Sequence, residues 1–359
     1  MSPKYIFGLL LFVLAIVCGQ EVPTIWADSL SRTSVTPVLN TEITRDQNLI
    51  YCATFQLAWN ELRDSVTAHQ TEDPAIIREL DKKTFTKDYL SEDCYVAMVG
   101  RYVNIVEKIN ELLTRKFGNE AWLLTKERVL ENLFSDSVLM AYAFLYKNLV
   151  FKEMFENLEE PIKFMTYGDT VDVDGFGVKE YKPQASKHKA LGKQAIIYHY
   201  TYNYETRSRE FIIGLLPEST NDEIIIAQIA PRNTLMETYA AVKEIIAKSK
   251  PDTLRKFETL QVPKLDFDIE HTFPEVERYL SSLVWGPAKA YQRIKFRLNE
   301  KGAILKSEAI IIAYEEIEVI EPRYLVVSEP FLIYLKQKDS PYPYLAMWVG
   351  NEELLLKTE

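Results

Sequence analysis

The sequence predicts a mixed α+β fold in a single large domain, and three observations lead to this prediction. Residues 195–204 (AIIYHYTYNY) and 290–298 (AYQRIKFRL) alternate apolar and polar side chains, the period of half-buried strands. Residues 74–134 instead repeat apolar side chains at three- and four-residue steps, which is typical of helices. The 12 glycines and 16 prolines form no low-complexity linker that would divide the 359 residues.

Residues 1–19 are predicted to be a secretory signal. Lys4 supplies the positive end, an apolar run follows, and small residues precede the expected cleavage after Gly19. The apolar run is too short to span a bilayer, so we expect no stable insertion into a membrane. Cys18 raises the alternative of a lipid anchor, but the preceding Ala-Ile-Val is a poor lipoprotein signal. We therefore expect a secreted protein, either extracellular or periplasmic.

The composition is that of an acidic globular protein. Asp and Glu number 52 against 42 Lys and Arg, which leaves a formal net charge of -10. Such a surface repels phosphate groups, so neither nucleic acid nor an anionic membrane is expected as a partner. We expect a monomer whose partner is another protein.

Residues 20–47 are polar and rich in Ser and Thr, and we interpret them as an exposed leader before a folded domain at 48–359. The domain opens with NLIYCATFQLAWNEL, which reads as a strand followed by a helix packed into a core. Cys52 lies where the strand passes into the helix, and Cys94 is the other cysteine after the signal. Secretion would permit a Cys52–Cys94 disulfide, whereas two buried free thiols are the alternative.

The remaining elements can be placed from their patterns. The apolar run within residues 137–155 predicts a strand that is covered on both faces. Residues 210–216 predict a strand, and residues 234–248 predict a helix. Asp169, Asp172 and Asp174 lie in a Gly- and Asp-rich stretch, but their spacing does not match a calcium loop, so we expect a turn between strands.

No constellation of enzyme residues is visible in the sequence. It contains no Gly-x-Ser-x-Gly, no His-Glu-x-x-His, no phosphate-binding glycine loop and no Cys-x-x-Cys pair. His69, His188, His199 and His271 are scattered at unrelated spacings. We therefore predict no catalytic residues, no metal site and no cofactor.

The stretch from residue 299 to residue 335 reads as strand, hinge, loop and strand. Glu300-Lys301-Gly302 follows the alternating segment 290–298, and its glycine permits a sharp change of backbone direction. The loop then contains IIIAY at residues 310–314. These β-branched and aromatic side chains favour a strand inside a sheet over a solvated loop.

This stretch resembles the serpins, in which a hinge ending in glycine closes a strand, a long loop carries protease bait and a Pro-Phe-rich strand follows. Here Glu300, Lys301, Gly302 and Ala303 resemble the hinge, residues 303–320 the reactive loop, and EPFLIY at 329–334 the following strand. Residues 137–155, FIIGLLPE at 211–218, VPKL at 262–265 and LAMWVGN at 345–351 are similar to further serpin segments. The resemblance implies three β-sheets surrounded by helices.

The resemblance also implies a mechanism, in which a protease cleaves the loop and the freed strand inserts into the main sheet. Counting along the loop places the bait at Glu315, Glu316 and Ile317, with the cut near Glu316-Ile317. Acids on both sides of that bond suit few serine proteases. Alternation predicts that Ala303 and Leu305 face inward and Ile304 outward if the segment inserts.

We hypothesise that residues 303–314 already form a strand of the main sheet or are covered by a partner. Leaving the isoleucines in water would forfeit about 1.5–3 kcal/mol for each side chain. A secreted, non-inhibitory binding protein is therefore the first functional hypothesis. A suicide-type protease inhibitor is the alternative, and an enzyme is the least favoured.

Overall fold

The computed structural model describes residues 22–65, 73–125, 139–182, 186–206, 208–284, 288–305 and 322–358. The predicted signal at residues 1–19, including Cys18, lies outside the described residues. So does the predicted bait at Glu315, Glu316 and Ile317. The predicted hinge is described in full.

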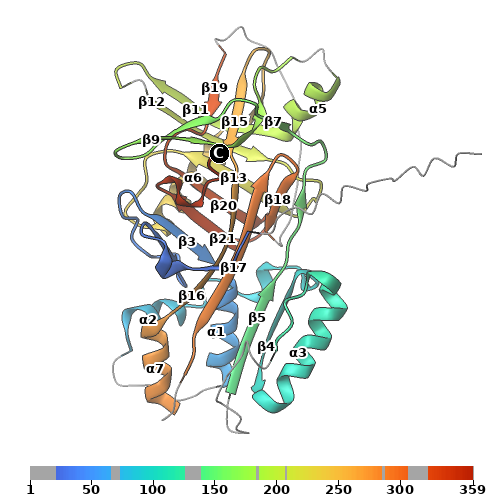
Figure 1. Cartoon of the computed structure of the whole chain (residues 1–359), viewed down its shortest axis with the longest axis vertical. Coiled ribbons are helices and arrows are strands. Elements are labelled where there is room, and N and C mark those ends of the chain that lie inside the picture. The colour runs from blue at the N-terminus through green and yellow to red at the C-terminus, as the bar shows by residue number, and fades with distance from the viewer. Residues whose placement is uncertain are drawn as a thin grey trace, which may run out of the picture.

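Three larger sheets and two hairpin-like pairs make up the β-structure (Figure 1). The eight-stranded sheet has the order β14 (Asp252–Thr253), β11 (Ala195–Asn203), β12 (Ser208–Leu215), β13 (Asp222–Gln228), β20 (Phe331–Gln337), β21 (Leu345–Val349), β3 (Asn48–Cys52) and β2 (Thr33–Thr36). The five-stranded main sheet has the order β1 (Ile25–Trp26), β16 (Leu265–Thr272), β17 (Tyr291–Asn299), β18 (Gly302–Leu305) and β6 (Leu149–Val150). The four-stranded sheet has the order β19 (Tyr324–Val326), β15 (Thr259–Pro263), β10 (Gly175–Val178) and β7 (Glu156–Asn157). The two-stranded pairs are β4 (Tyr95–Arg101) with β5 (Leu139–Leu145) and β8 (Ile162–Met165) with β9 (Thr170–Val173).

The helices lie around these sheets. The described part of the chain contains α1 (Thr54–Ser65), α2 (Ala75–Leu80), α3 (Tyr102–Phe117), α5 (Ser186–Gln194), α6 (Leu235–Lys248) and α7 (Pro274–Val284). In Figure 1, α1, α2, α3 and α7 occupy one end of the molecule and α5 the other. Helices of the length and hydropathy needed to cross a membrane are not found among the described residues.

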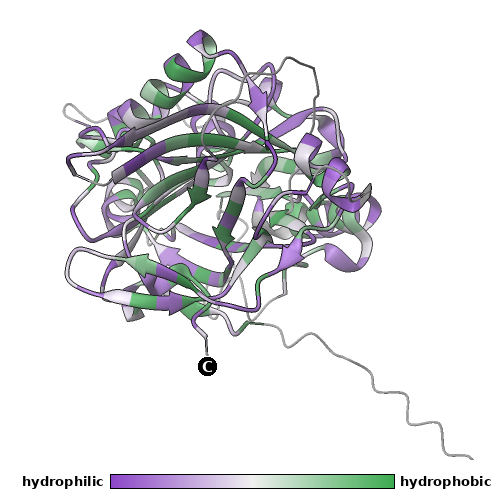
Figure 2. Ribbon diagram, turned by 90° about the horizontal axis from the view of Figure 1, so that it is seen from above, coloured by the Kyte–Doolittle hydropathy of each residue, from purple (hydrophilic) through white to green (hydrophobic). Residues whose placement is uncertain are grey.

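The eight-stranded sheet contains the most completely buried part of the core. Every residue of β21 and of β3 is buried, and only the last residue of β20 is not. Figure 2 shows the apolar strands running through the interior with polar segments outside them. These strands pair in register from Leu335↔Leu345 to Phe331↔Val349. Because both faces are covered, their sequences are almost continuously apolar.

Residues 22–47 do not form an exposed leader, so that interpretation is wrong for the described part of the segment. Ala27, Val35 and Leu39 are buried in the core. β2 pairs in parallel with β3, and β1 pairs in parallel with β16. The many Ser and Thr residues are not a sign of solvation here, because buried hydroxyls find internal partners: the Thr33 hydroxyl donates to the Glu353 carboxylate at 2.7 Å.

The prediction of helix through residues 74–134 is also wrong in its middle. α2 and α3 are helical, but residues 95–101 form β4 and pair with β5 from Tyr95↔Leu145 to Arg101↔Leu139. Val96 and Val99 stand at a helical step from the apolar residues of α3, so the sequence pattern appears continuous. The paired residues lie 38 to 50 positions apart in the chain, so the contribution of β5 cannot be seen in a local pattern. β5 is also only half-buried rather than covered on both faces.

Both ends of the chain cover the outer edge of the main sheet. β1 pairs with Ile269 and Glu270 of β16, and Leu355 bridges to Leu265. A covered edge cannot pair with another molecule, which prevents aggregation through that strand. His271 lies beside β1, with its Nδ1 buried without a hydrogen-bond partner and 3.7 Å from the Asp28 carboxylate.

We expect stability to decrease in acid because of His271. Burial lowers the pKa of His271, and the Asp28 carboxylate only partly opposes this effect. The unfolded chain therefore binds a proton more readily than the folded chain, and stability falls as the pH drops below about 6.5. Urea unfolding at several pH values from neutral to about pH 5 measures the slope of the free energy of unfolding against pH. His271→Gln should reduce the slope and Asp28→Asn should steepen it, and the opposite ranking would contradict this assignment.

Candidate functional site

The predicted hinge forms a tight reversal between two strands of the main sheet. β17 ends at Asn299, whose side-chain Oδ1 accepts a hydrogen bond from the Lys301 backbone N–H at 3.0 Å. β18 then returns antiparallel to β17, with Asn299↔Gly302 and Phe296↔Leu305 in register. Its other edge pairs with β6 through Gly302↔Val150 and Ala303↔Leu149. The first residues after the hinge therefore lie between two strands of the sheet.

Gly302 is required by this arrangement. Its backbone has φ of 148°, and a Cβ added there would stand 2.1 Å from the Leu149 carbonyl oxygen. Any other residue would both strain the backbone and push against β6. The glycine thus permits the close approach of the two strands.

The residues before Gly302 bind the segment that follows β6. The Glu300 carbonyl accepts a hydrogen bond from the Phe155 N–H, and the Lys301 carbonyl accepts one from the Phe151 N–H, both at 2.9 Å. The Glu300 carboxylate also lies 3.2 Å from the Lys264 ammonium, with both side chains mostly buried. The hinge is therefore fixed to its surroundings by backbone and side-chain contacts.

The side chains of β18 alternate between the two faces of the sheet. Ala303 is fully buried, opposite Leu298, while Ile304 is 36% exposed. This is the alternation expected from the sequence for an inserted strand. Only small side chains fit at the inward position beside the buried Leu298.

A side chain of β17 forms hydrogen bonds with the residues at the start of α1. The Gln292 side-chain amide donates to the Cys52 carbonyl at 2.9 Å and to the Thr54 hydroxyl at 2.6 Å. Thr54 thus provides a direct polar contact between the central helix and the main sheet.

The described chain resumes at Pro322, and Arg323 anchors it at once. Arg323 forms a two-point ion pair with Glu258, through Nε at 2.7 Å and Nη2 at 2.9 Å. Its guanidinium also lies 3.0 Å from the Asp252 carboxylate and donates to the Thr253 carbonyl. Glu258 is completely buried and Arg323 only 9% exposed. This residue is therefore not accessible as protease bait.

After Arg323, β19 joins the four-stranded sheet parallel to β15, and β20 begins at Phe331 inside the eight-stranded sheet. The order of strand, hinge, inserted strand, return strand and final buried strands matches the order expected from the resemblance. The fold is serpin-like. The predicted α+β class with three sheets surrounded by helices is confirmed in the described residues.

Comparisons with known proteins give the following results. Among solved structures, the chain is similar to Serpin48, a highly specific serpin in the insect Tenebrio molitor, with a TM-score of 0.47 and 12% identity over 86% of this chain and 92% of that one. It is also similar to thyroxine-binding globulin in complex with thyroxine, with a TM-score of 0.42 and 11% identity over 85% of this chain and 92% of that one. No family model and no curated protein matches the chain.

The two cysteines are not bridged. Cys52 and Cys94 are both free and buried, which corrects the alternative of a disulfide between them. Burial raises the pKa of both thiols, in the case of Cys94 to about 12. Neutral buried thiols are poor nucleophiles, so neither cysteine is suited to redox or covalent chemistry.

The histidines remain dispersed in the described part of the fold. His188 is held between Glu156 and the Lys182 backbone N–H, and His271 lies beside β1. The described residues contain no group of three or more His, Cys, Asp or Glu side chains that could hold a metal ion. His69 lies outside the described residues.

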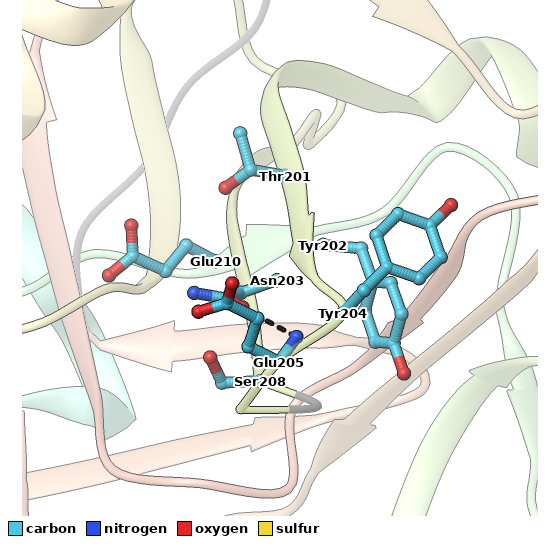
Figure 3. Close-up of a pocket in the computed structure, with 7 residues that line it drawn as sticks. All are labelled: Thr201, Tyr202, Asn203, Tyr204, Glu205, Ser208 and Glu210. Atoms are coloured by element: carbon cyan, nitrogen blue, oxygen red, sulfur yellow. Dashed lines mark hydrogen bonds between the residues drawn. The ribbon is translucent and has the colours of Figure 1, made fainter.

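A shallow hollow lies at the tip of the β11–β12 hairpin (Figure 3). It has a volume of about 630 Å³. Glu205, Glu210, Asn203 and Ser208 point to one side of the hairpin, while Tyr202 and Tyr204 project to the other. The Asn203 side-chain oxygen already accepts a hydrogen bond from the Glu205 backbone N–H at 2.9 Å. The hollow is open to solvent and holds no arrangement suited to catalysis.

Sequence reasoning predicted the chain reversal at Glu300-Lys301-Gly302 but missed the anchor at Arg323. The partner Glu258 lies 65 positions earlier in the chain, so no local pattern joins the two. The pair forms only because β15 and β19 become neighbours in the folded sheet.

Proposed function

We propose that the protein is a secreted, non-inhibitory binding protein on a serpin-like fold, whose segment after the hinge is held by the main sheet instead of being presented to a protease. The observation that carries this proposal is the position of β18 between two strands: Gly302–Leu305 pairs with β17, and Gly302 and Ala303 also pair with β6. A strand that has already entered the sheet has released part of the free energy that a loaded inhibitor must keep in reserve. The protein therefore acts by binding a partner at its surface and not by inserting a cleaved loop into the main sheet.

Two further features support this proposal. The described part of β18 ends opposite Phe296, and β17 continues to Tyr291, so the sheet offers a template for further strand residues. The sequence after Leu305 contains IIIAY, which favours such a position. The proposed bait around Glu316 is flanked by acids, and Arg323 is buried in its ion pair.

Limited proteolysis followed by a thermal melt tests the proposal. A glutamate-specific endoprotease is applied to the mature protein, and a variant with Gln in place of Glu308, Glu315, Glu316 and Glu318 serves as the control that lacks every glutamate of residues 306–320. We expect either resistance to cleavage in this segment or no rise in melting temperature after cleavage. Trypsin should not cleave after Arg323, because its guanidinium is buried.

The alternative function is suicide-type inhibition, with cleavage near Glu316-Ile317 and insertion of the freed strand. It is favoured by the length of residues 306–321, which separate β18 from Pro322. A large rise in melting temperature after cleavage, or a complex with any protease that survives SDS, would establish this alternative and overturn the non-inhibitory proposal.

A further inference from the structure

A cluster of lysines stands out on this acidic molecule. Residues 179–193 contain five lysines and one acid in a chain whose net charge is -10. Lys179 and Lys182 pair with nearby glutamates, at 2.7 Å and 3.3 Å. Lys187 and Lys189, both exposed on α5, take part in no ion pair within the described residues.

A second segment of this surface lies just before β15 of the four-stranded sheet. Lys256 and Phe257 are both exposed, and the Lys256 ammonium lies 4.5 Å from the centre of the Phe257 ring. No acidic side chain among the described residues forms an ion pair with Lys256. The neighbouring acid Glu258 is buried and already neutralised by Arg323, and Asp252 is bound by Arg255 and Arg323.

Tyr181 joins the two segments. Its backbone exchanges hydrogen bonds with residues 257 and 258, from the Phe257 N–H at 2.9 Å and to the Glu258 carbonyl at 2.8 Å. Its ring stacks on His188 of α5, with the ring centres 6.1 Å apart, and packs against Gly192 so closely that a Cβ there would be 2.4 Å from the phenol oxygen. α5 and the 256–257 turn are therefore one continuous, rigidly supported surface.

Phe257 is the feature that indicates what this surface binds. Its backbone has φ of 71°, a conformation that is unfavourable for a bulky side chain, and its ring is 49% exposed. Strain of this kind, together with an exposed ring, is typical of functional positions. The ring provides an exposed apolar contact next to the Lys256 ammonium, on the turn that Tyr181 joins to the helix carrying Lys187 and Lys189.

We propose that Lys187, Lys189, Lys256 and Phe257 form a docking surface for an acidic segment of a partner protein that carries an apolar side chain. The lysines complement the carboxylates, and the Phe257 ring receives the apolar group. A polyanion without apolar groups would use the lysines but would gain nothing from Phe257. This inference rests on the proposed function as a binding protein and specifies the chemical class of its partner.

The test uses a fluorescein-labelled peptide of aspartate and glutamate with one central phenylalanine, titrated with the full-length mature protein. Lys187→Glu/Lys189→Glu should weaken binding about tenfold or more, and the loss should shrink at high salt. The matched control Lys108→Glu/Arg115→Glu reverses two exposed charges on α3, at the opposite end of the molecule, and should leave binding unchanged.

Phe257→Asn removes the ring while keeping a residue that tolerates positive φ, so the melting temperature should not fall. It should weaken binding about tenfold. A peptide with serine in place of phenylalanine should bind the unaltered protein as weakly as the phenylalanine peptide binds Phe257→Asn. Phe257→Asn should not weaken the binding of the serine peptide any further. This second arm tests the apolar contact without altering the protein.

Equal affinity for all protein variants would overturn the proposal. So would tighter binding of heparin or single-stranded DNA than of the peptide, without sensitivity to Phe257→Asn, because the partner would then be a polyanion lacking an apolar group. These outcomes do not depend on cleavage of residues 306–321. Failure of the docking surface can therefore be distinguished from failure of the non-inhibitory proposal, which the proteolysis and melting experiment decides.

Discussion

Replacing Gly302 by alanine is expected to reduce the free energy of unfolding by about 2–4 kcal/mol. The new Cβ would stand 2.1 Å from the Leu149 carbonyl oxygen, on a backbone with φ of 148°. Neither atom can move without separating β18 from β6. Chemical denaturation monitored by tryptophan fluorescence measures the change, and a glutamate-specific protease measures whether the freed hinge becomes accessible.

Two glycines elsewhere in the chain separate the causes of this effect. Gly118 has φ of 53° with nothing within 4 Å of an added Cβ, so Gly118→Ala shows the cost of backbone strain alone. Gly168 also has open space and no positive φ, so Gly168→Ala should be nearly neutral. If Gly302→Ala costs no more than Gly118→Ala, β18 does not lie between β17 and β6. The carrying observation for the non-inhibitory function would then be lost.

Replacing Asp222 by asparagine is expected to destabilise the fold by about 3–5 kcal/mol, because it removes the counter-charge of a buried ammonium. Both carboxylate oxygens of Asp222 lie 2.6 Å from the Lys147 ammonium, and the two side chains are only 1% and 6% exposed. Burial raises the pKa of Asp222, and the Lys147 charge opposes that rise. Lys147 belongs to the segment that resembles the serpins, and its partner explains its position between β5 and β6.

Denaturant unfolding of Asp222→Asn provides the measurement. Asp172→Asn is the matched control, because its pair with Lys163 at 3.2 Å is exposed and should contribute no more than about 0.5 kcal/mol. The double variant Lys147→Met/Asp222→Leu should recover much of the loss, since it leaves no buried charge. A loss in Asp222→Asn as small as in Asp172→Asn would show that the pair is not buried as described.

Local sequence patterns were sufficient to predict two strands and one helix. The alternating residues 195–204 form β11, and residues 290–298 overlap β17 almost completely. The helix predicted at residues 234–248 is α6, which begins one residue later with Thr234 as its cap. In β17 and α6 the burial pattern follows the period of the chain, so the residues themselves carry the information.

Local patterns failed where the decisive contact was distant. Residues 95–101 form a strand because β5 lies beside them, although their valines also suit a helix. Part of the Ser- and Thr-rich segment before residue 48 is buried because its strand β2 pairs with β3 and its Thr33 hydroxyl donates to the Glu353 carboxylate of the C-terminal segment. Cys52 and Cys94 remain free because the fold buries each as an apolar side chain.

The sequence by itself determined the α+β class, the serpin-like order of segments and the position of the hinge, because glycine after two charged residues and the alternation around it are local properties. Only the tertiary structure decided that Gly302 and Ala303 pair on both edges and that Arg323 is bound by Glu258. It also joined the turn at Phe257 to α5 through Tyr181. These contacts join residues that are tens to hundreds of positions apart, and their free energy exists only once the sheets have formed.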